Sequence, residues 1–289
     1  TVDTEFMRER TYWPQLCLIQ LARPGSDDRA AAIVDPIDTE LDLSPLFRLL
    51  ADPSTVKVFH AARQDVEIFH HLGNVIPTPL FDTQVAAMVC GYGDQIGYET
   101  LVKKIARADL DKSSRFTDWS RRPLSDKQLA YAVGDVTHLR TIYETLSAQL
   151  DRTGRREWVA EEMAVLTDPA TYYTEPEEAW RRLKTRSNAP KFLAVVQALA
   201  KLREETAQTR DVPRNRVMKD DALLEIASAR PKTVEELSGL RLLQREGRKA
   251  DMAEAILAAV REAEATPPEQ RPQVEEKPHS KPGSGALVE

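Results

Sequence analysis

Hydrophobic residues near the N-terminus are spaced as in β-strands. Val2, Thr4 and Phe6 alternate with charged residues, whereas the largely apolar run at 15–22 predicts a central strand. A shorter run at 30–34 follows a Pro-Gly turn sequence and predicts a third strand. Because the connections are short, we expect these strands to form an antiparallel meander.

From Ser44 onward the spacing changes to strands that alternate with amphipathic helices. Ser44-Pro45 is expected to open a helix, with Ser44 as its cap. A strand is expected at 56–60 and a helix at 62–72, ended by Gly73. A strand-like segment at 80–83 then leads into the apolar run 85–89, and 98–105 is expected to form another helix. This order predicts an α/β domain with a mixed sheet and helices packed on it.

The longest predicted helix begins after Ser125. Gln128 follows three positions later, which is the spacing of a capping box, and hydrophobic residues recur at helical spacing as far as Gly154. The preceding segment, 109–123, lacks periodicity but contains several basic and aromatic residues. Such loops can stack bases and contact phosphates, although most basic surface loops are simply solvated.

Composition changes after Leu166 and predicts a second domain. We expect an exonuclease-sized domain at 1–166, a linker at 167–175, an all-α helical bundle at 176–265 and a disordered tail at 266–289, which is rich in Pro, Glu and Lys. The helices of the bundle are expected at 177–186, 190–206, 219–228, 233–238 and 248–263.

Composition also limits the class of protein. The 289 residues are 42% hydrophobic and 30% charged, and no apolar run is long enough to span a membrane. The two cysteines, Cys17 and Cys90, indicate neither a disulfide framework nor a zinc site, so a reducing cytoplasm is expected. The formal net charge of −6 argues against a nucleic-acid partner, but 175–261 has an excess of basic residues. Since the first residue is Thr1 rather than Met, we expect a fragment that lacks its N-terminus.

Two carboxylates define the first candidate site. In an extended strand Asp3 and Glu5 point to the same face, about 7 Å apart. Their mutual repulsion favours a cation between them, and hard divalent ions such as Mg²⁺ prefer carboxylate oxygens. The alternative is an edge strand whose acids face water, and further acids downstream are needed to decide between the two.

Further candidates lie on the predicted helices. Asp65 falls in the first turns of the 62–72 helix, where an acid also simply favours the positive helix N-terminus. Tyr131 and Asp135 are four residues apart on the long helix and share a face, as a surface pair would. Gly134 lies between them and permits a close approach of another group.

Taken together, these residues resemble the three exonuclease motifs of the DEDD superfamily, in its tyrosine-bearing branch. The surrounding sequence is similar to the bacterial ribonuclease D family over nearly the whole chain. The matching segments are Asp-Thr-Glu-Phe at 3–6, Tyr-Trp-Pro-Gln-Leu at 12–16, His-Ala-Ala-Arg-Gln-Asp at 60–65, Thr-Asp-Trp at 117–119, Arg-Pro-Leu at 122–124 and Tyr-Ala-Val-Gly-Asp at 131–135.

The resemblance implies a ribonuclease H-like fold for the first domain and a metal-dependent site. Asp3, Glu5, Asp65 and Asp135 would be ligands of two divalent ions, Mg²⁺ or Mn²⁺, and Tyr131 would hold the attacking water. The sister branch of the superfamily has a histidine where this chain has Ala130. An ordinary tyrosine, with a pKa near ~10, is a poor base at neutral pH, so an orienting role is expected for Tyr131.

The second domain resembles the HRDC domain, which implies nucleic-acid binding. Its candidate phosphate contacts are Lys219, Arg241 or Arg245. The candidate nucleic-acid contacts of the first domain are Phe6, His60, Lys112, Trp119 and Arg122. His60 is included because the family places a residue near the terminal nucleotide at this position.

The resulting hypothesis is a cytoplasmic, monomeric 3′–5′ exoribonuclease that trims the 3′ extensions of tRNA precursors without a membrane partner. Two alternatives remain open at the level of the sequence. One is a 3′–5′ DNA exonuclease, since recognition of a 2′-hydroxyl can depend on a single contact. The other is an inactive fragment that only binds nucleic acid.

Overall fold

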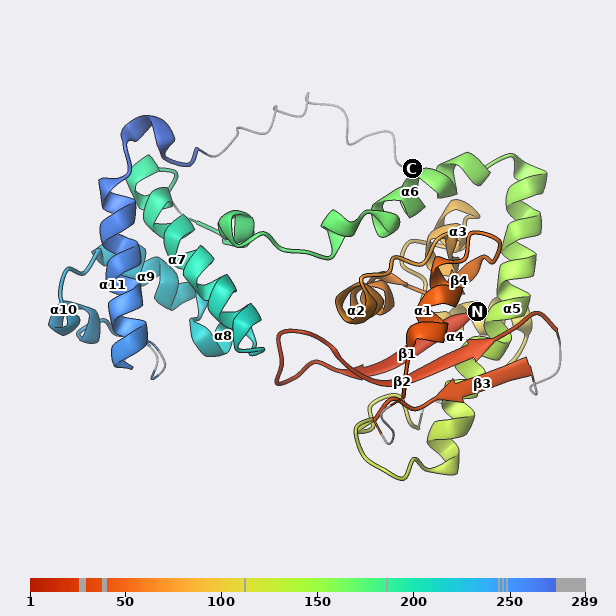
Figure 1. Cartoon of the computed structure of the whole chain (residues 1–289). Coiled ribbons are helices and arrows are strands. Elements are labelled where there is room, and N and C mark those ends of the chain that lie inside the picture. The colour runs from red at the N-terminus through yellow and green to blue at the C-terminus, as the bar shows by residue number, and fades with distance from the viewer. Residues whose placement is uncertain are drawn as a thin grey trace. The chain divides into compact units, whose positions relative to one another are not determined.

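The structure is a computed structural model that describes residues 1–25, 30–37, 41–111, 113–185, 187–243, 245, 247 and 249–273. The chain divides into two compact units, Thr1–Thr174 and a second unit that begins at Glu175 (Figure 1). The predicted linker at 167–175, between domains ending at 166 and beginning at 176, is a finer division than this one and stays a prediction.

The first unit begins with the predicted meander, which is confirmed. Strands β1 (Val2–Met7), β2 (Gln15–Ala22) and β3 (Ala31–Val34) form an antiparallel sheet in the order β1-β2-β3. The pairing of β1 with β2 shifts between Glu5, which faces Leu18, and Phe6, which faces Leu16. Cys17 therefore has no facing partner in this register, which is the pattern of a β-bulge.

The next elements alternate as predicted: α1 (Ser44–Ala51), β4 (Lys57–Phe59), α2 (Arg63–Gly73), β5 (Leu80–Asp82) and α3 (Thr83–Val89). Strands β4 and β5 pair in parallel. In the described part of the chain, the hydrogen-bonded strands thus form two small sheets rather than one continuous mixed sheet, although β1 and β4 approach each other.

Three predicted helix ends differ from the structure. Leu43, not Ser44, is the N-cap of α1, and the Asp42 carboxylate accepts the Ser44 N–H at 2.9 Å. Gly73 is the last residue of α2 rather than its stop, because Asn74 adopts the left-handed conformation (φ 50°) that ends the helix. The helix expected at 98–105 is α4 (Tyr98–Leu101) followed by a π-helix at Val102–Ala106.

Helix α5 (Asp126–Thr153) is the long helix that the sequence predicts. Ser125 and Gln128 form the expected capping box, and Gly154 ends the helix with φ 67°. One face of α5 is fully buried against α3 and the strands, through Val136, Ile142, Leu146 and Leu150. Full burial of such a side chain contributes about 1.5–3 kcal/mol, so this face fixes where the polar residues of α5 point. Helix α6 (Arg156–Thr167) and a short 3-10 helix at Pro169–Thr171 complete the unit.

The second unit is the predicted all-α bundle. A 3-10 helix at Pro176–Arg182 replaces the α-helix expected at 177–186, and α7 (Pro190–Thr209) packs against it. Helix α7 also packs against α8 (Arg214–Val217), α9 (Asp220–Ala229) and α11 (Ala250–Ala265), and α10 (Val234–Ser238) packs against α11. A segment that was expected to be disordered contains a 3-10 helix at Pro268–Gln270, and 274–289 lie outside the described residues.

None of the helices in the described ranges combines the length and the apolar character needed to cross a membrane.

Candidate active site

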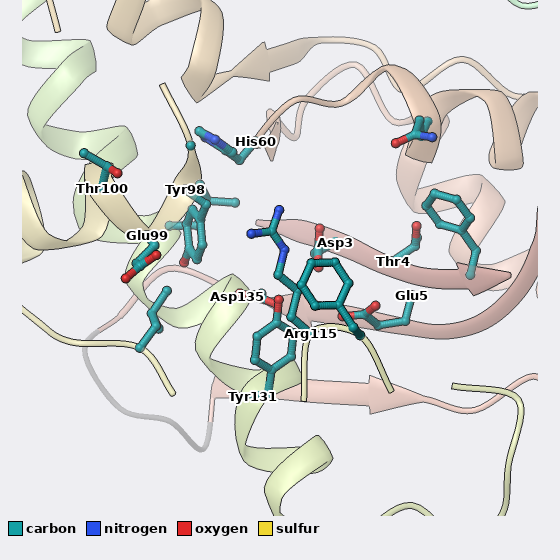
Figure 2. A pocket seen from close by; sticks show the side chains of 16 residues that line it. Asp3, Thr4, Glu5, His60, Tyr98, Glu99, Thr100, Arg115, Tyr131 and Asp135 are labelled. Carbon is teal, nitrogen blue, oxygen red and sulfur yellow. The ribbon is translucent and has the colours of Figure 1, made fainter. Parts of the chain in front are cut away.

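Strand β1 and helix α5 bring three of the predicted carboxylates together. On β1, Val2 and Thr4 are buried on one face, which turns Asp3 and Glu5 to the other. Asp135 of α5 faces them, and one oxygen of each of the three carboxylates lies within 4.8 Å of the others (Figure 2). The alternation predicted for the strand therefore holds at both acids.

The position of Asp135 depends on close packing around the preceding residue. The Tyr98 hydroxyl donates a hydrogen bond to the carbonyl of Gly134 at 2.9 Å. A Cβ added to Gly134 would lie 3.4 Å from the side chain of Leu110, so the glycine accommodates a tight contact. The predicted close approach at Gly134 is thus made by protein side chains.

The carboxylates are buried among like charges, and their pKa values are raised. Burial, followed by the charges of Asp3, Asp135 and Asp65, raises the pKa of Glu5 to about 9. Burial raises the pKa of Asp135 to about 7, although the Tyr131 hydrogen bond and Arg115 oppose the shift. Burial and Asp135 also raise the pKa of Asp3. In the described part of the chain, no basic side chain forms an ion pair with these three acids. Their mutual repulsion is therefore not offset by an ion pair, and a cation bound between them would offset it.

Asp65 lies close to this cluster but is not one of the three acids whose oxygens come together. Its carboxylate accepts a hydrogen bond from the Thr4 hydroxyl at 2.5 Å, on the other face of β1. Burial and then the charge of Asp3 raise its pKa, which places the two carboxylates within electrostatic reach of each other. The structure therefore assembles three of the four predicted ligands and keeps the fourth beside them.

Tyr131 lies one turn before Asp135 on α5 and lines the same cavity. Burial and the charge of Asp135 raise the pKa of its hydroxyl. Its ring also packs near Trp119, with ring centroids 6.0 Å apart. A phenol that stays protonated is a hydrogen-bond donor rather than a base, in agreement with the orienting role expected from the sequence.

The acids form the floor of a cavity of about 630 Å³. Two of the predicted nucleic-acid contacts, Phe6 and His60, line it. His60 Nδ1 lies 2.9 Å from the hydroxyl of Thr83, and burial lowers the pKa of its ring. Lys112 lies outside the described residues.

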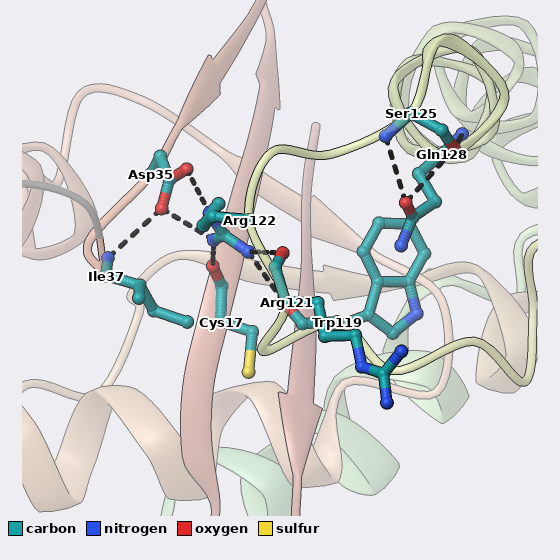
Figure 3. A network of polar contacts seen from close by, with 8 residues as sticks. All are labelled: Cys17, Asp35, Ile37, Trp119, Arg121, Arg122, Ser125 and Gln128. Carbon is teal, nitrogen blue, oxygen red and sulfur yellow. Dashed lines mark hydrogen bonds and ion pairs between the residues drawn. The ribbon is translucent and has the colours of Figure 1, made fainter.

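Trp119 and Arg122 do not fit the contact role predicted for them. Trp119 is only 2% exposed and packs against Cys17, Leu18 and Ala132. The Arg122 guanidinium binds both oxygens of Asp35 at 2.6 Å and donates to the carbonyls of Cys17, Trp119 and Arg121 (Figure 3). Both side chains hold the 109–123 loop on the sheet, so the prediction is corrected to a structural role.

Several cavity residues are not among the site residues predicted from the sequence. Arg115 and Phe116, from the same loop, line the cavity beside Tyr98. The sequence signal for them was a loop with basic and aromatic residues, but Trp119 belongs to the same loop and is buried.

A buried amide lies opposite Asp3. Gln20 of β2 faces Asp3 across the strand pair, and its side chain has no hydrogen-bond partner among the described residues.

A cluster of carboxylates beside a tyrosine, on a strand and a crossing helix, is the arrangement of a metal-dependent exonuclease domain. A sequence model for 3′–5′ exonucleases matches residues 1–151, and one for the HRDC domain matches residues 192–260. Exonucleases of this class depend on divalent metal ions.

Individual relatives agree with this class. Ribonuclease D of Jannaschia sp. (strain CCS1) is 59% identical over 275 residues, which are 95% of this chain and 71% of that protein. Ribonuclease D of Nitrobacter hamburgensis is 50% identical over 289 residues, covering 100% of this chain and 74% of that protein. The crystal structure of Escherichia coli RNase D, described as an exoribonuclease involved in structured RNA processing, aligns with a TM-score of 0.83 at 35% identity. It covers 94% of this chain and 71% of that one.

The chain belongs to the ribonuclease D family of 3′–5′ exoribonucleases. The expected ribonuclease H-like domain and HRDC domain are thereby confirmed.

Proposed function

We propose that this chain removes nucleotides one at a time from the 3′ ends of tRNA precursors, with two divalent ions held by Asp3, Glu5, Asp65 and Asp135. The observation that carries the proposal is the set of three carboxylates, Asp135 buried and Asp3 and Glu5 half-buried, with one oxygen of each within 4.8 Å of the others. Their raised pKa values show that the fold holds these groups at a cost that a bound cation would offset.

The donor set fits hard divalent ions because it consists of carboxylate oxygens alone. Asp3, Glu5 and Asp135 would hold the metal directly, and Asp65 would exchange its Thr4 hydrogen bond for a place in the site. When bound, the ions would supply an activated water and would offset negative charge on the leaving oxygen.

Tyr131 contributes a donor. Since its hydroxyl stays protonated and already bonds to Asp135, it would orient the attacking water or a phosphate oxygen without taking a proton. Tyr131→Phe should therefore slow cleavage while the pH profile keeps its shape, because no titrating group is removed.

The family supports this substrate class, as does the Escherichia coli relative, which is described as an exoribonuclease involved in structured RNA processing. A 5′-labelled tRNA with a 3′ extension and a single-stranded DNA of the same sequence as that extension would be incubated with Mg²⁺ or Mn²⁺. We expect a ladder of products one nucleotide apart on RNA that chelator and Asp135→Asn both abolish. Equal shortening of the DNA would overturn the substrate assignment, and binding without shortening would overturn the catalytic one.

We also propose that the protein acts as a cytoplasmic monomer. Both cysteines are free, Cys17 buried and Cys90 half-buried, as a reducing compartment permits. Light scattering during size-exclusion chromatography tests the oligomeric state, with 32.5 kDa expected for a monomer.

A further inference from the structure

Arg115 and Phe116 occupy the two central positions of a tight turn. The Thr117 N–H donates to the Ser114 carbonyl at 3.2 Å, and the Thr117 hydroxyl donates to the same oxygen at 2.7 Å. Ser114 is 3% exposed whereas Phe116 is 91% exposed. The turn therefore buries its ends and projects its two central side chains outward.

Contacts on either side fix this turn in place. The Thr117 hydroxyl oxygen also accepts a hydrogen bond at 3.2 Å from the side chain of Gln128, which belongs to the capping box of α5. Two residues beyond the turn, Trp119 is buried against β2, and Arg122 is held by Asp35. The exposure of Phe116 is thus a property of an anchored loop, and little backbone entropy would be lost when a ligand binds there.

The same two side chains line the cavity whose floor carries the acids. The Arg115 guanidinium carbon lies 5.2 Å from the centroid of the Phe116 ring, in a cation–π arrangement. Arg115 also acts electrostatically on Asp135 and Tyr131, which places its positive charge close to the reacting end of the cavity. Figure 2 shows Arg115 in front of Asp135 and Tyr131.

An exposed aromatic ring next to a guanidinium matches the two parts of a nucleotide, a flat base and a phosphate. We propose that Phe116 stacks on the base of one nucleotide of an unpaired RNA 3′ end and that Arg115 binds its phosphate. This inference rests on the proposed function and adds to it a specificity: the enzyme needs a single-stranded nucleotide at this point, but tolerates any base, because every base has a π-face.

The first test is single-turnover cleavage of a single-stranded 12-nucleotide RNA over a range of enzyme concentrations. Stacking of one base on an aromatic ring corresponds to roughly 5- to 150-fold in affinity. Phe116→Ala should raise the apparent dissociation constant by about 10-fold, with little change in the cleavage rate at saturating enzyme. Phe116→Trp should restore the dissociation constant of the unmodified protein. Arg115→Gln should lower the salt dependence of binding by about one phosphate contact.

Trp158 provides a matched control. It is an exposed aromatic residue, 59% exposed, with the Arg155 guanidinium 5.4 Å from its ring, but it lies on α6 and does not line the cavity. Trp158→Ala should leave the apparent dissociation constant and the cleavage rate at saturating enzyme unchanged. If it weakened binding as much as Phe116→Ala did, the effect would be a general one of exposed aromatic residues and the inference would fail.

A second test identifies the stacked nucleotide. An abasic residue is introduced at each of the last four positions of the RNA in turn, and affinity is measured for the unmodified protein and Phe116→Ala. At one position, the abasic residue should weaken binding to the unmodified protein but not to Phe116→Ala. The variant already lacks the ring on which that base would stack, so removing the base costs it nothing further. Additive losses at all four positions would overturn the stacking proposal, although a normal RNA ladder would leave the proposed function intact. Loss of the ladder in the unmodified protein would refute the proposed function itself.

Discussion

Helices α5 and α7 both carry buried charged residues, but the charges around Asp135 of α5 differ from those around Arg203 and Glu204 of α7. On α7, Glu204 is paired with Arg214 at 2.6 Å, and Arg203 is paired with Asp220 at the same distance. On α5, Asp135 forms no ion pair among the described residues, although the charge of Arg115 acts on it, and it faces two further acids. A buried charge with a partner is part of the scaffold, whereas a buried charge among like charges indicates a site for a ligand. The difference between the two helices can be tested by removing a charge from each.

The largest expected effect is on catalysis. Asp135→Asn removes one metal ligand and should lower the single-turnover rate by at least about 1000-fold, since a metal supplies several kcal/mol to the transition state. The thermal midpoint in chelator should stay the same or rise, because an uncompensated buried charge has been removed. Rate and circular dichroism are measured on the same preparation. A variant that unfolds in chelator would show that Asp135 is structural.

The opposite pattern is expected on α7. Glu204→Gln leaves Arg214 without its carboxylate and should destabilise the second unit by about 2–3 kcal/mol. This is less than the ~3–5 kcal/mol for breaking a fully buried pair, because Arg214 is partly exposed. Urea denaturation followed by circular dichroism measures this change. Cleavage of a short single-stranded RNA should be unaffected under conditions where the unit is folded, and a large loss of rate would contradict a purely structural pair.

The acid cluster should also make the stability of the first unit depend on pH. Glu5 has a pKa near 9 in the folded protein, above that of an exposed glutamate, so its contribution to stability is complete at about pH 4 and is lost as the pH rises through 9. In chelator the first unit should therefore lose stability between pH 6 and pH 9, by at most about 4 kcal/mol, because each pH unit between the two pKa values corresponds to about 1.4 kcal/mol. Added Mg²⁺ should stabilise the unit more at pH 9 than at pH 6. Glu5→Gln should flatten both dependences, as measured by differential scanning calorimetry.

The smallest expected effect concerns Gln20, the residue of β2 that faces Asp3. Gln20 is fully buried, and its side chain has no partner among the residues that the structure describes. If a water joins this amide to Asp3, Gln20→Met should weaken Mn²⁺ binding by about 10-fold, as for other groups that orient metal ligands. Stability in chelator should not fall. Unchanged Mn²⁺ affinity by titration calorimetry would mean that the amide does not support Asp3.

The residues that the sequence placed correctly depend on local periodicity. Asp3 and Glu5 share a face because side chains alternate along a strand, and Asp135 shares a face with Tyr131 because of the helix repeat. That Asp135 belongs with the two acids was implied by the family resemblance, not by the repeat. The misplaced residues depend on distant ones. Arg122 is bound by Asp35, which is 87 positions away, and Trp119 is covered by β2. No pattern within the 109–123 loop distinguishes Trp119, which the fold buries, from Phe116, which it exposes.

The orientation of Asp65 was also beyond the sequence. Its place in the first turn of α2 was predicted, but its hydrogen bond to Thr4 spans 61 positions and depends on how β1 and α2 pack. The approach of β1 to β4 is set by the same tertiary packing, and strand patterns alone contain no information about it.

The shift in pairing between β1 and β2 has a consequence for how the enzyme can vary. The unpaired residue of β2, Cys17, accepts a hydrogen bond from Arg122 on its carbonyl at 2.8 Å. This hydrogen bond joins the irregular part of β2 to the 109–123 loop. Deleting Cys17 would make the pairing of β1 and β2 regular, but it would also remove an acceptor of Arg122. A change in this stretch of β2 would therefore affect both the pairing of the strand that carries the two acids and the loop that carries Arg115 and Phe116.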